Sequence, residues 1–170
     1  TDNYTAERKR VNAGEFPKDK MERVNKDLAE AEDIAENTLR RLAMEYHKDA
    51  KKLRGSTQER TFKLAHDLYK HYLAVFPTPK PGSDVNYVFF MRFYYAEVLY
   101  RLEKFKDSAE NYDIVVAMVP QPEKERQIKV VLSAAEEAVR SWDELVSDMD
   151  RLNPPEISGT ERKPIPEVKE

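Results

Sequence analysis

Apolar residues recur three and four positions apart along most of this chain of 170 residues. This spacing is the period of an α-helix that buries one face. Glycine and proline are sparse and lie at the breaks between these stretches, so the pattern divides into several helices. We predict an all-α fold with helices at about 18–53, 57–76, 84–102, 105–119 and 123–152.

One segment carries a competing signal. The residues from Val85 to Tyr95 are rich in aromatic and β-branched side chains, which favour strands. Met91, Ala96 and Leu99 nevertheless continue the helical spacing, and no turn residue interrupts the run. We therefore predict a helix here as well.

The first predicted helix is long for a globular domain. A coiled coil is one interpretation, but the apolar face is rich in alanine and too short for sustained heptads. A helix within a stacked array of helices fits better. The predicted apolar face consists of Leu28, Ala31, Ala35, Thr38, Leu39, Leu42, Ala43 and Tyr46.

The same pattern divides the chain into three regions. Residues 1–17 are an N-terminal extension, and residues 18–152 are the helical domain. Residues 153–170 contain four prolines and few large apolar side chains, which indicates a linker or a loosely ordered tail.

Charge and cysteine content argue against several classes of function. The 29 basic and 32 acidic side chains leave a formal net charge of −3, and the two signs alternate, so nucleic acid is not an expected partner. Cysteine is absent, which excludes disulfides, cysteine nucleophiles and thiolate metal sites. No apolar run approaches the roughly 18 residues that a membrane-spanning helix needs, so we expect no direct membrane insertion.

The chain carries an internal repeat. A shift of 43 positions aligns small, aromatic and proline residues of two helices in the same order. A small residue lets a neighbouring helix approach closely, an aromatic residue fills the space one turn later, and the proline ends the helix. The aligned pairs are Phe62 with Phe105, Ala65 with Ser108, Tyr69 with Tyr112, Leu73 with Val116, Ala74 with Ala117 and Pro77 with Pro120.

This order resembles the second helix of a tetratricopeptide repeat, and Tyr95, Ala96 and Leu99 occupy the matching positions of its first helix. The resemblance implies antiparallel helix hairpins stacked into a right-handed solenoid of about 2.5 to 3 repeats. Two departures are clear. The shift exceeds the family period of about 34 residues by about nine, which the loop Thr78–Val85 can absorb, and Arg92 replaces a large apolar residue.

Two stretches narrow the resemblance, HDLYKHYLAVFP and FYYAEVLYRLEKFKDSAENYDIVVAMVP. They are similar to envelope-associated tetratricopeptide proteins of predatory and gliding bacteria, including components attached to the gliding-motility machinery. This similarity implies a periplasmic or outer-membrane-associated scaffold within a larger envelope complex. If only the general tetratricopeptide resemblance holds, the expected compartment is the cytoplasm.

A solenoid of this type exposes the inner faces of its first helices as a concave groove. An aromatic floor beside a basic wall would suit an extended peptide or a helix of a partner protein. The alternative is that Phe90 and Phe93 are covered by a flanking helix or by the proline loop. The family pattern places in the groove Phe90, Phe93, Glu97, Tyr100 and Arg101, together with Asn37, Arg40, Met44, His47 and Lys48.

Nothing in the sequence indicates catalysis. His66 and His71 are five residues apart and point to different helix faces, so they do not form a shared metal site. His47 is expected to be solvated or to line the groove. Phosphate-binding loops and nucleophile motifs are absent, and we expect no metal, no cofactor and no enzyme activity.

The sequence therefore supports two functions. The first is a non-enzymatic scaffold that binds a partner protein of unknown identity in the groove. The second is a structural spacer that stacks on further repeats and has no groove ligand. Trp142 bears on this choice, because it either packs the last repeat or supports self-association through the terminal helix.

Overall fold

The computed structural model describes residues 6, 9–10, 13–14, 18–80, 85–118 and 125–152, and none of these lies in a strand. The prediction of an all-α fold is confirmed. Each predicted helix is present, and its ends differ from the prediction by no more than about three residues. The helices are α2 (Lys18–Ala50), α3 (Gly55–Val75), α4 (Tyr87–Arg101), α5 (Phe105–Ala117) and α6 (Glu125–Leu152).

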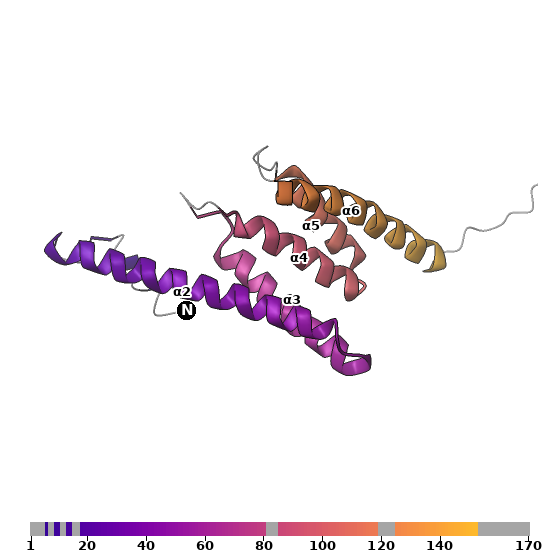
Figure 1. Cartoon of the computed structure of the whole chain (residues 1–170), viewed down its shortest axis with the longest axis horizontal. Coiled ribbons are helices and arrows are strands. Elements are labelled where there is room, and N and C mark those ends of the chain that lie inside the picture. The colour runs from indigo at the N-terminus through magenta and orange to yellow at the C-terminus, as the bar shows by residue number, and fades with distance from the viewer. Residues whose placement is uncertain are drawn as a thin grey trace, which may run out of the picture.

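The helices pack in chain order. α2 packs on α3, α3 on α4, α4 on α5 and α5 on α6. Figure 1 shows this succession across the molecule, with the N-terminal half of α2 projecting past the other helices. Contact between sequence neighbours is a property that a repeat solenoid requires. A right-handed tetratricopeptide superhelix stays a prediction.

Both ends of α4 have local explanations. At its start, the Asn86 side chain accepts a hydrogen bond from the Phe89 amide at 3.0 Å. At its end, Glu103 has a positive φ of 58°, and the Lys104 amide donates to the Leu99 carbonyl at 3.0 Å. This geometry closes the helix as a left-handed cap normally occupied by glycine. The tight turn brings α5 back antiparallel to α4.

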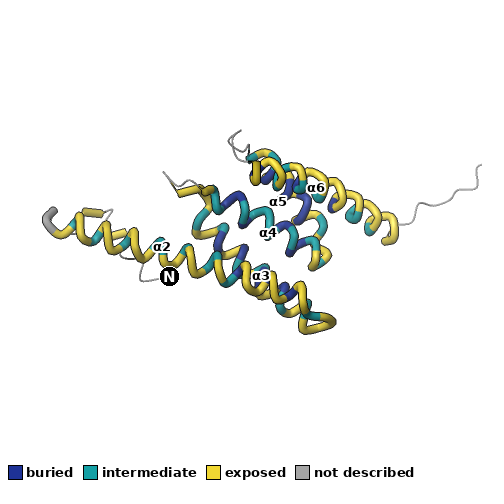
Figure 2. The backbone as a smooth tube through the Cα atoms, in the orientation of Figure 1, coloured by how far each residue is buried: buried dark blue, intermediate teal, exposed yellow. Residues whose placement is uncertain are grey.

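Two clusters of buried side chains form the core, and α4 contributes to both. Because α4 is covered on two sides, its residues are apolar almost all round. Figure 2 shows the buried positions concentrated where α3, α4 and α5 meet. The first cluster contains Ala43, Ala50, Phe62, Ala65, Tyr69, Tyr72, Met91 and Val98. The second contains Phe89, Ala96, Tyr112, Val115, Ala134 and Ala138.

The aligned helices α3 and α5 repeat in burial as well as in sequence. Ala65 and Ser108 are both 0% exposed, and Tyr69 and Tyr112 are 0% and 2% exposed. The later pairs also agree in burial class, since Leu73 and Val116 are half-buried and Ala74 and Ala117 are exposed. The first pair differs, since Phe62 is buried and Phe105 is half-buried, so four of the aligned pairs occupy equivalent environments in successive helix pairs.

The predicted apolar face of α2 is wrong in part. Ala31, Ala35, Thr38 and Tyr46 are exposed. The buried positions of the helix are instead Ala43, His47 and Ala50. The reason is that only the C-terminal half of α2 is covered by other described helices, and these contact it along a face rotated from the alanine stripe.

The terminal regions are described only in small part. Of residues 1–17, the structure describes 6, 9–10 and 13–14, and the predicted tail at 153–170 lies outside the described residues. Among the helices that are described, none has the length and apolar character needed to cross a membrane.

Candidate functional site

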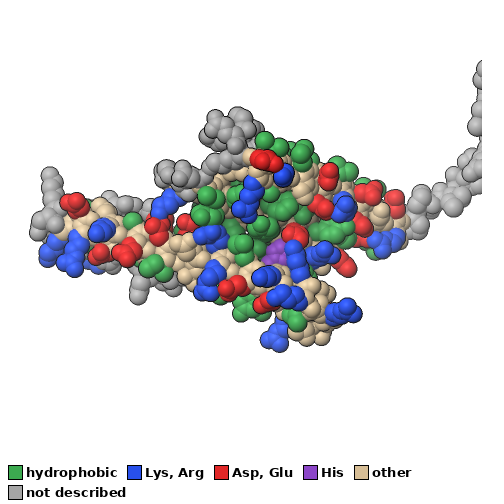
Figure 3. Space-filling view, in the orientation of Figure 1, with side chains coloured by type: hydrophobic (Ala, Val, Ile, Leu, Met, Phe, Trp, Pro, Cys, Tyr) green, Lys and Arg blue, Asp and Glu red, His purple; other side chains and the backbone are tan. Residues whose placement is uncertain are grey.

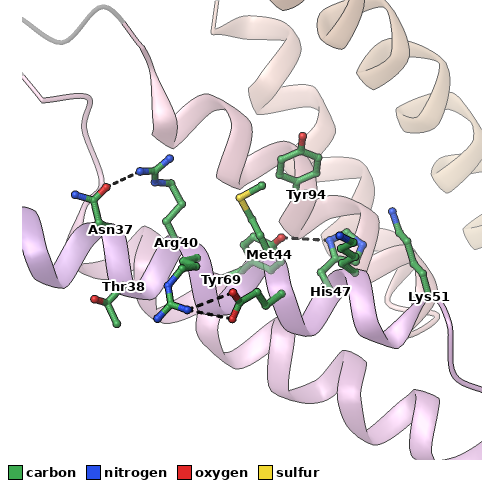
Figure 4. Close-up of a pocket in the computed structure, with 11 residues that line it drawn as sticks. Asn37, Thr38, Arg40, Met44, His47, Lys51, Tyr69 and Tyr94 are labelled. Atoms are coloured by element: carbon green, nitrogen blue, oxygen red, sulfur yellow. Dashed lines mark hydrogen bonds and ion pairs between the residues drawn. The ribbon is translucent and has the colours of Figure 1, made fainter.

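A groove with a volume of about 680 Å³ lies between α2 and α4. We call it the α2–α4 groove. Figure 4 shows α2 side chains along one wall and Tyr94 of α4 opposite, with Met44 pointing toward Tyr94. The lining residues are Asn37, Thr38, Arg40, Arg41, Met44, Glu45, His47, Lys48, Lys51, Tyr69 and Tyr94.

Helical spacing explains how α2 supplies most of this lining. Asn37, Arg40, Met44, His47 and Lys51 are three or four residues apart, so their side chains lie on one face. Met44 occupies the middle of this face and is 42% exposed. The groove therefore exposes an apolar side chain at its centre.

His47 lies at the base of the groove. It is 4% exposed, and its ring lies edge-on to the rings of Tyr69 and Tyr94. Its Nδ1 lies 3.2 Å from the Tyr69 hydroxyl oxygen, a contact drawn in Figure 4. His47 thus lines this groove as a buried and not a solvated side chain, and its part in binding a partner stays a prediction.

Burial also controls the charge of His47. Loss of solvation lowers the pKa of the imidazole from its usual 6.5 to about 4, and the attraction of the Glu97 carboxylate opposes this only in part. Glu97 Oε2 is 3.7 Å from Nε2, which makes no hydrogen bond to the described residues. At neutral pH the base of the groove is therefore an uncharged aromatic surface.

A basic wall runs along α2 above this base. Arg41 pairs with Glu45 at 3.2 Å and Lys51 pairs with Glu97 at 2.5 Å. Lys48 makes no ion pair with the described residues. Figure 3 shows Lys and Arg side chains along the lower margin of an apolar band on this face. The wall consequently keeps an excess of positive charge.

Contacts with neighbouring side chains hold Arg40, a cation of this wall, in place. Its guanidinium carbon lies 3.6 Å from the centre of the Tyr87 ring, and its Nη2 donates to Asn37 Oδ1 at 2.5 Å. Stacking on an aromatic ring holds an arginine in place while leaving its charge available. Arg40 Nε is buried and makes no hydrogen bond to the described residues.

The predicted site residues separate into two groups. Asn37, Arg40, Met44, His47 and Lys48 all line the α2–α4 groove. The residues predicted on α4 do not line it, although Glu97 reaches its edge through its ion pair with Lys51.

The other predicted residues of α4 face away from the groove. Phe90 and Phe93 pack against the second core cluster, as the alternative interpretation held. The Tyr100 hydroxyl donates to Glu144 of α6 at 3.5 Å. Arg101 is exposed and borders smaller hollows toward α3. A partner-binding role stays a prediction for all of these residues.

Sequence reasoning missed the aromatic residues that form the base. The sequence pattern indicates only helix packing for Tyr69, and it does not single out Tyr94, which lies between two predicted groove residues, Phe93 and Glu97. Lys51 could have been found, because it continues the spacing from Lys48 and His47. On α4, the side that lines the groove is therefore one residue further around the helix than the predicted side.

Among the other histidines, His66 lies beside a carboxylate and a lysine. His66 Nδ1 lies 2.8 Å from Asp67 Oδ1, and its Nε2 lies 3.2 Å from Lys104 Nζ. Within the described residues, no group of three His, Asp or Glu side chains could hold a metal ion. The absence of a metal, a cofactor and catalysis in the whole protein stays a prediction.

No family model, curated protein or solved structure matches this chain. The tetratricopeptide resemblance accordingly rests on the aligned residues alone.

Proposed function

We propose that this chain is a non-enzymatic scaffold that binds a peptide or helix of a partner protein in the α2–α4 groove. The observation that carries the proposal is the groove itself, with Met44 42% exposed at its centre over a base formed by His47, Tyr69 and Tyr94. An apolar centre with a charged margin is the usual composition of a protein-binding surface.

The length of the groove favours a protein segment as the ligand. From Asn37 to Lys51 the lining follows four turns of α2, which corresponds to about 20 Å. A partner segment of about six extended residues, or a helix of similar length, would span it. Both walls are regular helices that pack into the first core cluster, so the surface is largely preformed.

The bacterial-envelope setting is part of the proposal and rests on the sequence resemblance alone. A scaffold of helical repeats in such a complex would hold its partner through this groove. Identification of the partner protein would therefore also identify the compartment.

A structural spacer is the second candidate, and one observation favours it. Val139, Val146 and Met149 of α6 are 70%, 55% and 57% exposed on one side of the helix. A spacer that stacks through its ends would cover such a side. In that case changes in the α2–α4 groove would have no effect on assembly.

The test of the scaffold compares two substitutions on α2. Peptides selected from a displayed random library against the 170-residue chain would be measured for affinity to the wild type, Met44→Asp and Tyr46→Asp. Tyr46 is the matched control, because it is 39% exposed but does not line the groove. We expect Met44→Asp to weaken binding by at least about tenfold and Tyr46→Asp to leave it unchanged.

Two results would count against groove binding. One is a selection that yields no peptide, and the other is an equal response of both variants. If sedimentation then showed an assembly that Val139→Glu dissociates, the spacer would be the better account.

A further inference from the structure

α6 carries an apolar seam beside the face that packs on α5. Its residues are spaced alternately by four and three, which is the 3.5-residue period of a helix that packs along another helix. Leu132 and Val139 are 61% and 70% exposed, so this is not the face that α6 buries. We call it the α6 seam, and it consists of Ile128, Leu132, Ala135, Val139, Trp142, Val146 and Met149.

The neighbouring face of α6 is already occupied. Ala134, Ala138 and Ser141 are buried there, and the Ser141 hydroxyl lies 3.2 Å from the Ser108 hydroxyl of α5. α2 pairs with α3 and α4 pairs with α5, but among the described residues no helix pairs in this way along the α6 seam. The seam has the length and period to receive one.

The charges beside the seam identify its occupant. Glu136, Asp143 and Asp150 follow one flank at seven-residue intervals, all exposed and none in an ion pair with the described residues. At the edge of the seam nearer α5, the Trp142 indole donates to Asp113 Oδ2 of α5 at 3.2 Å. The one cation of the first flank, Lys129, is paired with its helix neighbour.

We propose that the α6 seam binds an amphipathic helix of a partner protein with Lys or Arg beside its apolar positions. Antiparallel pairing of two copies about Val139 brings Glu136 near Asp143 of the copy but also Lys129 near Asp150. Charge therefore gives a second copy no net attraction, whereas a cationic helix is attracted along the whole flank. Anionic lipid headgroups would be repelled by the same carboxylates. The inference is independent of the α2–α4 groove.

The test uses the single tryptophan of the chain as its reporter. Two helical peptides of about three heptads share leucines at the seam positions and carry either Lys or Glu along both flanks. We expect the Lys peptide to shift Trp142 emission to the blue and to bind about tenfold more tightly than the Glu peptide. At about 0.5 M salt this preference should shrink, because exposed charges are screened.

Substitutions in the chain locate the site. Val139→Glu should abolish binding, and Leu64→Glu on α3, at a side chain that is 45% exposed, should not. Reversing the charges of Glu136, Asp143 and Asp150 to Lys should invert the preference for the two peptides. Both effects should also appear in calorimetric titrations, which do not depend on Trp142.

Three outcomes would overturn the inference. Neither peptide binds, both bind equally at low salt, or the chain alone forms a micromolar dimer that Val139→Glu dissociates. The last result would assign the seam to a second copy. Met44→Asp should leave affinity for the Lys peptide unchanged, so failure of the groove and failure of the seam are distinguishable.

Discussion

The buried imidazole of His47 makes the stability of this protein depend on pH. Its pKa falls from 6.5 in the unfolded chain to about 4 in the folded chain, chiefly because burial removes the charged form from water. Glu97 raises this pKa and Lys51 and Arg101 lower it, but these effects are smaller than that of burial. The native structure therefore favours the neutral ring.

The sign and size of the effect follow from this shift. Between pH 6.5 and about 4 the unfolded chain binds a proton that the folded chain does not, so the free energy of unfolding decreases as the pH falls. One pKa unit corresponds to about 1.4 kcal/mol, so the full loss is about 3 kcal/mol below pH 4. At pH 5 the expected loss is about 2 kcal/mol. Above pH 6.5 the contribution of neutral His47 is complete.

Urea denaturation of the wild type and of His47→Asn between about pH 7 and pH 5 tests this account. Asn keeps a polar group near the Tyr69 hydroxyl but does not titrate in this range. We expect the variant to be less stable at neutral pH and to lose about 2 kcal/mol less on acidification than the wild type does. All other ionisable groups are common to both proteins, so the difference isolates His47.

Equal acid losses in the two proteins would refute the reasoning. So would an imidazole titration of His47, followed by NMR in the folded protein, with a midpoint near that of an exposed histidine. Either result would mean that the ring is hydrated or paired when protonated.

Two further predictions concern packing, and urea denaturation checks both. Tyr72 is fully buried and its hydroxyl donates to Glu36 Oε1 at 2.8 Å, so Tyr72→Phe should lower the free energy of unfolding by about 1–2 kcal/mol. No loss would mean that water replaces the hydroxyl. Ala65→Leu and Ser108→Leu, at equivalent sites with 0% exposure, should each cost about 2–3 kcal/mol by overpacking, whereas exposed Lys70→Leu should cost little. A large cost at only one of the two sites would contradict their equivalence.

Much of the fold could be predicted because its signals are local. Helix periodicity and the prolines placed every helix within about three residues of its observed ends. The alignment of Tyr69 with Tyr112, and of Ala65 with Ser108, also predicted equivalent burial, because small and aromatic residues at the same helix positions pack against the neighbouring helix in the same way.

The candidate site was predicted only in part. The α2 residues of the groove were found because three- and four-residue spacing places them on one face whatever lies beyond it. On α4 the same reasoning selected Phe90 and Phe93, which pack inward, and passed over Tyr94. α4 is apolar almost all round, so its sequence contains little information about which side faces the groove.

Local patterns in the sequence are therefore sufficient to predict the helices, their order and the repeated small and aromatic positions, since these depend on interactions within a few residues. Which helix faces are covered depends on how the helices pack. This packing buries His47 rather than Tyr46, turns Phe93 toward α5, and leaves Val139 of α6 exposed. Each outcome depends on a helix from elsewhere in the chain that packs against the residue. The hydrophobic effect favours burial in proportion to the apolar area that this helix removes from water.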